Sequence, residues 1–292
     1  MNINKPKDIT SFGVVSSLKK KLNVKKIGHA GTLDPMATGV LLVCLGEATK
    51  LVPYLMDLKK EYGALMKLGE ETTTEDRTGV VTKTQDYFRL TETDIRKVFR
   101  VFRGESEQRP PLFSALKYKG KPLYKYARDG IEISPSTRKI TVYKLEILDI
   151  SLPFVRFRVE CSKGTYIRSL CRDIGNVLGV GAHLFELERT SIGTFHVDKS
   201  ISLEDIENKK IQVYGMNEAL EHISNVSIKK ESIQKILNGI HPKKEDLKLS
   251  GIPRFKEGGL VKLVSGEDKV LAMARVQKGP IFQLLRVFPV SF

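Results

Sequence analysis

The chain has 292 residues, which is long enough for one large domain and a smaller one. Its 49 Lys and Arg residues outnumber its 34 Asp and Glu residues by 15, and no apolar run approaches the roughly 20 residues that cross a bilayer. The composition therefore argues against a membrane-spanning helix and favours a polyanionic partner such as nucleic acid. Charge alone would equally suit a basic protein without such a partner.

The cysteines Cys44, Cys161 and Cys171 are odd in number, widely spaced and without a Cys-x-x-Cys pair. We expect them to be buried thiols in a reducing compartment. The five His residues are equally scattered, which argues against a zinc site. The N-terminus lacks the basic-then-apolar pattern of a secretory signal, so a cytoplasmic location is expected.

The first predicted elements are a strand at residues 2–5, a turn around residues 6–8 and a helix. Thr10 or Ser11 could cap this helix, because apolar residues with helical spacing follow from Val14 onward. The apolar runs 40–45 and 62–68 predict two buried strands.

Between the helix and the first of these strands, residues 28–39 read Gly-His-Ala-Gly-Thr-Leu-Asp-Pro-Met-Ala-Thr-Gly. The glycines permit backbone angles that other residues resist, and Pro35 biases Asp34 toward extended geometry. A single carboxylate in so constrained a loop suggests an active site. A turn in which Asp34 only caps backbone amides is the plainer interpretation.

Residues 91–94 approximate a capping box and open an amphipathic helix, which the Pro-containing segment 108–115 ends. Cations and aromatics then alternate, as Lys117, Tyr118, Lys119, Lys121, Tyr124, Lys125, Tyr126 and Arg128. Such a surface could grip phosphates and stack on exposed bases, or be a solvated helix whose Tyr rings pack inward. The pattern alone leaves both readings open.

Strand-type alternation at 138–150 and 154–161 flanks a turn at Leu152 and Pro153, and Gly164 introduces a helix with an apolar face. Residues 190–196 predict another strand. Strands with interspersed helices favour an α+β fold with a mixed or antiparallel sheet over a doubly wound parallel one.

Residues 226–292 hold 13 Lys and Arg against 6 Asp and Glu. A predicted helix at 229–238 opens this region, and short strands such as 259–264 and 270–276 follow between polar turns. This pattern indicates a small β-barrel.

Three blocks together resemble the bacterial tRNA pseudouridine synthase B family. They are the loop at 28–39, which matches the family's catalytic loop at eleven of twelve positions, the Lys-x-Tyr at 60–62, and the Gly-Thr-Tyr-Ile-Arg at 164–168. The blocks occur in the family's order, and the similarity runs over most of the chain.

The resemblance implies a catalytic domain at residues 1–225 with an insertion at about 81–136, a thumb that closes on the tRNA T arm. It also implies a PUA-like RNA-binding domain at 226–292. One departure is Asp8, where the family usually has Gly, and this puts the geometry of that turn in doubt.

Pseudouridine formation breaks the C1′–N1 bond of uridine, rotates the base and joins C1′ to C5. The reaction consumes no phosphate and involves no redox step, so neither a cofactor nor a metal is expected, in keeping with a sequence that carries no P-loop or dinucleotide fingerprint. It needs one positioned carboxylate that attacks C1′ or stabilises an oxocarbenium-like sugar.

The resemblance makes Asp34 that carboxylate and pairs it with Arg168, whose guanidinium would keep it ionised. Tyr62 would stack on the flipped base and take part in proton transfer, although a Tyr at the start of an apolar strand is more often a core residue.

Four further residues are implied to bind substrate. His29 would help displace the base, Leu187 would line the uracil pocket, and Lys60 and Tyr166 would contact substrate within their motifs. Lys60 could equally bond nearby backbone.

The expected function is therefore pseudouridine formation at T-loop position 55 of tRNA, by a monomer that needs no guide RNA and no membrane. Two alternatives stay open at this point. One is a guide-dependent synthase acting on ribosomal RNA, and the other is a non-catalytic module that binds or folds tRNA.

Overall fold

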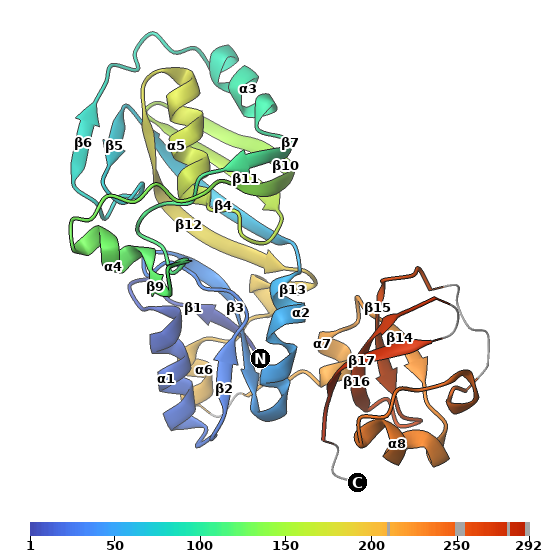
Figure 1. Cartoon of the computed structure of the whole chain (residues 1–292). Helices are drawn as coiled ribbons and strands as arrows, with labels where there is room; N and C mark the ends of the chain where they lie inside the picture. The colour runs from blue at the N-terminus through green and yellow to red at the C-terminus, as the bar shows by residue number, and fades with distance from the viewer. Residues whose placement is uncertain (209–210, 249–254, 279–280, 290–292) are drawn as a thin grey trace.

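A computed structural model describes residues 1–208, 211–248, 255–278 and 281–289 (Figure 1). Within these residues the largest feature is a nine-stranded sheet. Its strands are β1 (Asn2–Lys5), β2 (Ile27–His29), β3 (Thr38–Leu45), β4 (Lys60–Leu68), β7 (Gly104–Gln108), β10 (Arg138–Ser151), β11 (Phe154–Cys161), β12 (Ala182–Ile192) and β13 (Phe195–His196).

The strands follow the order β1-β3-β12-β4-β11-β10-β7, with β2 beside β3 and β13 beside β12. Their pairings are antiparallel except that of β12 with β3, which is parallel and joins only Glu188 to Thr38 and Arg189 to Gly39. Gly39 is required there, because its φ is +99° and a Cβ would collide with the Arg189 backbone. The sheet thus consists of two halves that meet at this short junction.

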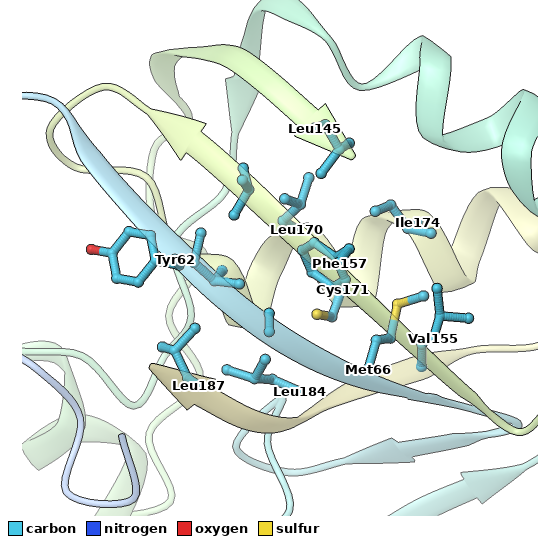
Figure 2. Close-up of a cluster of buried hydrophobic side chains, with 14 of the residues drawn as sticks. Tyr62, Met66, Leu145, Val155, Phe157, Leu170, Cys171, Ile174, Leu184 and Leu187 are labelled. Atoms are coloured by element: carbon cyan, nitrogen blue, oxygen red, sulfur yellow. The ribbon is translucent and has the colours of Figure 1, made fainter. Parts of the chain in front are cut away.

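Helices cover each half and create its core. On the β4 half, α3 (Glu92–Val101) and α5 (Ile167–Leu178) pack on the sheet, whereas α1 (Ser11–Lys21) and α6 (Leu203–Glu207) pack beside β1 and β3. The facing side chains in Figure 2 are Leu170, Cys171 and Ile174 of α5 and Met66, Val155 and Phe157 of the sheet. No helix in the described ranges has the length and apolarity to span a bilayer.

Most predicted elements are present with nearly the predicted bounds. Thr10 caps α1, and Thr91 with Asp94 forms the capping box of α3. Asp8 adopts φ +64°, a left-handed conformation that glycine adopts readily. The turn therefore forms with Asp at the position where the family usually has Gly.

The predicted strand at 190–196 is wrong in its bounds. β12 begins at Ala182, and a turn separates it from the two-residue β13. The first part of the strand was not predicted because it contains three charged residues, Glu186, Glu188 and Arg189. The two carboxylates face solvent, whereas the guanidinium is buried by tertiary contacts.

The predicted insertion at 81–136 is not separate from the main sheet over its whole length. Ile95 and Phe99 of α3 belong to the core, and β7 pairs with β10 at the edge of the main sheet. The part outside the sheet runs from residue 109 to 137 and holds β8 (Lys117–Tyr118), β9 (Lys121–Pro122) and α4 (Leu123–Arg128). Before it, β5 (Glu70–Thr72) and β6 (Val81–Thr84) form a separate hairpin.

Near the C-terminus, a second sheet has the order β14 (Ser224–Ser227), β15 (Leu260–Val264), β16 (Val270–Val276) and β17 (Phe282–Val287). Its pairings show a small sheet rather than a closed barrel among the described residues. The predicted helix at 229–238 is a 3-10 turn (Lys230–Ser232) followed by α8 (Ile233–Leu237). Parts of the predicted domain, at 249–254, 279–280 and 290–292, lie outside the described residues.

This small sheet shares a core with the half of the main sheet that contains β3. One apolar cluster includes Leu42, Leu55 and Ile192 together with Val264, Met273 and Phe288 of the C-terminal region.

The connecting segments carry α2 (Val52–Met56), α7 (Met216–Ala219) and the 3-10 turns Gly46–Leu51, Val197–Lys199 and Lys244–Asp246.

Candidate active site

A cavity of about 340 Å³ lies at the N-terminal end of α5, between the loop that carries Asp34 and residues 114–116. Six of the seven residues singled out from the sequence line it, namely Asp34, Lys60, Tyr62, Tyr166, Arg168 and Leu187. Asp34 is the one carboxylate among the described lining residues, which also include five cationic side chains. The cavity is thus a strongly positive pocket around a single acid.

The N-terminal segment holds the loop on both sides of Asp34. Buried Ser11 accepts from Leu33 N–H at 2.8 Å and donates its hydroxyl to Leu33 C=O at 3.1 Å. Pro35 C=O accepts from the Asp8 N–H at 2.8 Å and from the Lys5 ammonium at 3.0 Å. The carboxylate therefore stands between two residues whose backbones are tied down.

Lys5 is fully buried and donates to two more carbonyls, those of Pro6 and Ile9. Burial lowers the pKa of its ammonium to about 8, against the opposing effect of Asp34 and Asp8. Its role in the structure is to bind carbonyls beneath the loop.

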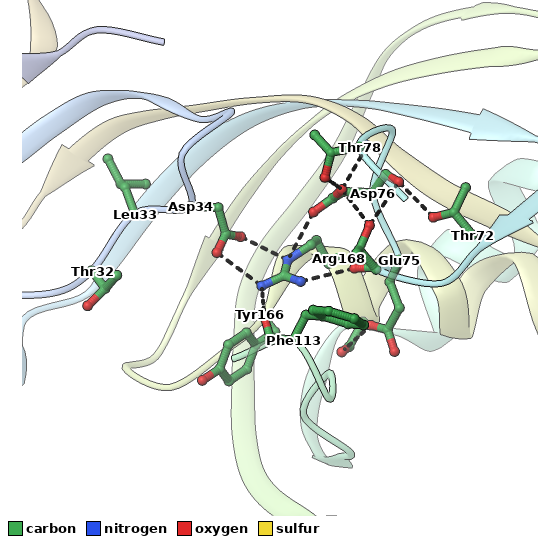
Figure 3. Close-up of polar contacts among 12 residues, drawn as sticks. Thr32, Leu33, Asp34, Thr72, Glu75, Asp76, Thr78, Phe113, Tyr166 and Arg168 are labelled. Atoms are coloured by element: carbon green, nitrogen blue, oxygen red, sulfur yellow. Dashed lines mark hydrogen bonds and ion pairs between the residues drawn. The ribbon is translucent and has the colours of Figure 1, made fainter. Parts of the chain in front are cut away.

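Arg168, in the first turn of α5, grips Asp34 with two hydrogen bonds (Figure 3). Its Nε donates to Oδ2 at 2.8 Å and its Nη2 to Oδ1 at 3.0 Å. The arginine side chain is 3% exposed whereas that of Asp34 is 30% exposed, so the carboxylate keeps access to the cavity. This two-point contact fixes the carboxylate plane, which a lysine could not do.

The remaining guanidinium donors bind two other segments. Nη1 donates to the Thr74 carbonyl and Nη2 to the Phe113 carbonyl, each at 3.0 Å. Arg168 therefore ties the Asp34 loop to the β5–β6 hairpin and to the segment that covers the cavity.

A second carboxylate, Asp76, lies 3.7 Å from Arg168 Nε and is 5% exposed. Its Oδ1 accepts from the Thr74 hydroxyl at 2.7 Å, the Thr78 N–H at 2.9 Å and the Thr78 hydroxyl at 2.6 Å. Sequence reasoning missed Asp76. The only signal was the polar run at residues 72–78, which is not specific.

Glu75 extends this network along α5. It accepts from the Ser169 hydroxyl at 2.8 Å and from Arg172, whose other bonds reach Asp173 and the Arg109 carbonyl. Burial raises the pKa of the Glu75 carboxyl, although Arg172 opposes the shift. The start of α5 is therefore held to the neighbouring segments by two acids and two arginines.

Tyr62 lies on β4 beside the cavity and is 8% exposed. Burial raises the pKa of its phenol, while the positive charge of Arg189 lowers it, and the net shift is upward. The phenol consequently stays protonated at neutral pH and remains able to donate a proton.

Arg189 on β12 was also missed, although it is one of the most deeply buried side chains. Its Nε donates to the Val40 carbonyl at 2.7 Å, and its Nη2 and Nη1 reach the carbonyls of Gly31 and Thr32 at 3.1 and 3.4 Å. It thus joins the two halves of the sheet and supports the loop that carries Asp34.

Lys60 and Tyr166 have defined partners. The buried Lys60 ammonium donates to the carbonyls of Met56 and Leu58, and burial lowers its pKa to about 8. Tyr166 precedes α5, where the side-chain amide of buried Gln108 accepts from its N–H at 2.8 Å and donates to its carbonyl at 3.0 Å. Leu187 supplies an apolar wall of the cavity.

His29 is the predicted residue that does not line this cavity. It is half-buried on β2, its Nδ1 has no hydrogen-bond partner, and burial together with Arg189 lowers the pKa of its imidazole. The ring is therefore neutral at physiological pH.

The arrangement suits chemistry at an electron-poor carbon. A carboxylate that faces a pocket of nucleoside size can attack such a carbon or stabilise a developing cation. The lining provides no second acid to activate water. The described residues contain no cluster of three His, Cys, Asp or Glu side chains that could hold a metal ion.

Solved structures share this architecture. A Cbf5–Nop10–Gar1 complex matches with a TM-score of 0.76 and 32% identity over 98% of this chain and 84% of that one. An H/ACA RNP bound to a substrate RNA containing 2′-deoxyuridine matches with a TM-score of 0.75 and 31% identity over 99% and 84%. The fold is thus the mixed α+β fold of a pseudouridine synthase.

The sequence comparisons identify the family within the class of pseudouridine synthases. The family model described as TruB family pseudouridylate synthase, N-terminal domain, matches residues 19–167, and that of the tRNA pseudouridylate synthase B C-terminal domain matches residues 168–224. The tRNA pseudouridine synthase B of Clostridium tetani is 44% identical over 280 residues, 95% of each chain. That of Clostridium kluyveri is 48% identical over 247 residues, 84% of this chain and 85% of the relative. This chain belongs to the TruB family.

Proposed function

We propose that this protein converts uridine to pseudouridine at T-loop position 55 of tRNA. The activity follows from membership of the family and from relatives named tRNA pseudouridine synthase B. The observation that carries the chemistry is the two-point contact of Arg168 with Asp34, the single acid in a cavity lined by five cations.

In the proposed reaction the Asp34 carboxylate attacks or stabilises C1′ while the C1′–N1 bond breaks and its electron pair leaves with the base. The base rotates, C5 bonds to C1′ while any bond between C1′ and the carboxylate breaks, and the proton on C5 is lost as N1 gains one. Arg168 keeps the carboxylate oriented throughout, because its Nε, Nη1 and Nη2 all donate to acceptors on neighbouring segments.

The neighbouring residues take the roles that the family resemblance implies. Tyr62 stacks on the flipped base and handles a proton late in the reaction, and Leu187 packs against the uracil ring. Tyr166 contacts substrate from the entrance to α5, and His29 helps to displace the base before it enters. Lys60 supports the pocket wall through the Met56 and Leu58 carbonyls.

We further propose that the enzyme acts alone, as a cytoplasmic monomer, on bare tRNA. Residues 109–137 would grip the T arm, and residues 226–292, as a PUA-like domain, would contribute phosphate contacts. Identity above 40% with proteins named tRNA pseudouridine synthase B, against 31% with the H/ACA RNP and 32% with the Cbf5–Nop10–Gar1 complex, favours this choice.

The test is nucleoside analysis of an unmodified tRNA transcript incubated with the purified chain, without guide RNA or metal. Pseudouridine at one T-loop position is expected from the wild type and none from Asp34→Asn, which should keep its tRNA affinity within a few-fold. A wild type that binds tRNA tightly but forms no pseudouridine would favour a non-catalytic or guide-dependent protein.

A further inference from the structure

The hydroxyl of Ser114 lies at the active-site cavity without a hydrogen-bond partner. Of the buried side-chain polar atoms that lack such a partner in the described part of the chain, only Ser114 Oγ belongs to a residue lining this cavity. Ser114 is 5% exposed, so water does not replace the missing partner. By contrast, the hydroxyl of Ser162, which lines the same cavity, accepts from the Thr141 N–H at 2.9 Å. A buried hydroxyl without a partner opposes folding, so its presence at an active site calls for a functional reason.

The backbone around Ser114 is held in place. The Phe113 carbonyl accepts from Arg168 Nη2 at 3.0 Å, and the Ser114 carbonyl accepts from the Tyr124 N–H of α4 at 3.0 Å. The Ser114 N–H donates to the Leu112 carbonyl at 2.9 Å. Rotation about the Cα–Cβ bond is therefore the freedom left to the side chain, and it is sufficient to direct the hydroxyl to a ligand.

Ser114 borders the cavity beside the catalytic pair. Arg168 Nη2 donates both to Asp34 Oδ1 and to the carbonyl of the residue before Ser114, each at 3.0 Å. Tyr62 and Leu187, to which the uracil ring is assigned, belong instead to β4 and β12 of the main sheet. The hydroxyl therefore approaches the substrate from the segment that covers the cavity, next to the carboxylate that has to reach C1′.

This position favours the ribose over the base as the partner of the hydroxyl. The carbon bonded to C1′ within the sugar is C2′, whose hydroxyl can donate and accept a hydrogen bond, as the serine hydroxyl can. A contact with a uracil carbonyl would have to break when the base rotates, whereas C2′ stays bonded to C1′ throughout the reaction. The 2′-hydroxyl is also the group by which a protein distinguishes RNA from DNA.

We propose that the Ser114 hydroxyl hydrogen-bonds the 2′-hydroxyl of the target nucleotide and thereby selects a ribose at this position. Binding of a ribonucleotide supplies the partner that the free protein lacks, whereas a deoxynucleotide leaves the hydroxyl buried and unpaired. The inference rests on the proposed function, because that function places C1′ of the substrate at Asp34.

The kinetic test uses two T-arm hairpins that carry either uridine or 2′-deoxyuridine at the target position. Ser114→Ala should lower kcat/KM about tenfold on the uridine hairpin and leave it unchanged on the deoxyuridine hairpin. Any difference in the intrinsic reactivity of the two hairpins is common to all variants, so it cancels when their ratios are compared. Ser162→Ala, the matched control, removes a hydroxyl that already has a protein partner and should change kcat/KM by the same factor on both hairpins.

The stability test uses thermal unfolding of the free protein. Ser114→Ala should keep or raise the melting temperature, because it removes a buried hydroxyl that has no partner. Ser162→Ala should lower it, because the Thr141 N–H loses its acceptor. Unimpaired stability combined with a loss of ribose selectivity is a result that a merely structural serine would not give.

Three results would overturn the inference. In the first, Ser114→Ala lowers kcat/KM by the same factor on both hairpins, and in the second it lowers neither. The third is a lower melting temperature of Ser114→Ala, which would show that the hydroxyl already has a partner in the free protein. All three leave the proposed function intact if wild type converts the uridine hairpin. A wild type that forms no pseudouridine from that hairpin defeats the proposed function itself.

Discussion

Arg168 stands between two carboxylates, with its Nε 2.8 Å from Asp34 Oδ2 and 3.7 Å from Asp76 Oδ2. The carboxylate of Asp34 faces the cavity. The carboxylate of Asp76 is buried and accepts three hydrogen bonds from Thr74 and Thr78. The guanidinium is consequently positioned from behind by Asp76 and the Thr74 carbonyl while it positions Asp34 in front. The candidate site thus contains an arginine whose own position is fixed by contacts on both sides.

Replacing Arg168 with lysine should lower kcat by about 100-fold, because an ammonium cannot hold both Asp34 oxygens in one plane. The tRNA dissociation constant should stay within a few-fold. Single-turnover assays with saturating enzyme and filter binding measure the two quantities. A lysine variant with near wild-type kcat would show that charge alone, without the planar fork, is sufficient.

Asp76→Asn should lower kcat about tenfold or more without weakening tRNA binding. Its amide oxygen can replace Oδ1 toward the threonines, but its NH2 group would then face the Arg168 donors and displace the guanidinium. Asp86→Asn, an acid after the β5–β6 hairpin that caps the Phe88 N–H, serves as control. If both variants turned over alike, Asp76 would have no positioning role.

Ser11→Ala should slow the reaction because it leaves the Leu33 N–H without its buried acceptor beside Asp34. The loss of that partner is expected to cost about 1–3 kcal/mol. A fall in kcat at unchanged KM is the signature of a displaced catalytic loop, and Ser11→Thr should restore part of it. Ser17→Ala, on the same helix, provides the comparison. Equal stability and equal kcat for all three variants would contradict the prediction.

The lowered pKa of the Lys60 ammonium leads us to expect that stability depends on pH. Its folded pKa of about 8 lies below the ordinary 10.5, so between these values the unfolded chain binds more protons than the folded one. The free energy of unfolding should therefore rise with pH across this window, as the burial of a charged ammonium ceases to oppose folding. In urea titrations on either side of the window, Lys60→Met should show a smaller rise than wild type. Parallel pH profiles would mean that Lys60 is not buried as an ammonium.

The sequence predicted the fold where local patterns coincide with tertiary structure. Strands 62–68 and 154–161 alternate regularly and lie at the centre of the main sheet, and the box at Thr91 has its capping function. The first part of β12 was not predicted, because its Glu186 and Glu188 face solvent and its Arg189 is buried by hydrogen bonds to three carbonyls distant in sequence. No local pattern encodes such contacts.

The candidate site shows the same division. The motifs around Asp34, Tyr62 and Arg168 identified the residues that the cavity brings together. Asp76 and Gln108 act on residues 92 and 58 positions away, and their own neighbourhoods in sequence carry no signature. Supporting residues of this kind become visible only when the chain is folded.

The apolar cluster that joins Leu42 and Ile192 to Met273 and Phe288 is a hydrophobic core shared by the two regions. The buried Lys262 ammonium reinforces the joint by donating to the Asn217 and Leu220 carbonyls. A chain shortened at residue 225 would lay this shared interior open to water, so its failure to bind tRNA would report unfolding rather than a lost contact. Whatever the C-terminal region contributes to RNA binding has to be measured on the intact chain, by removing surface charges one at a time.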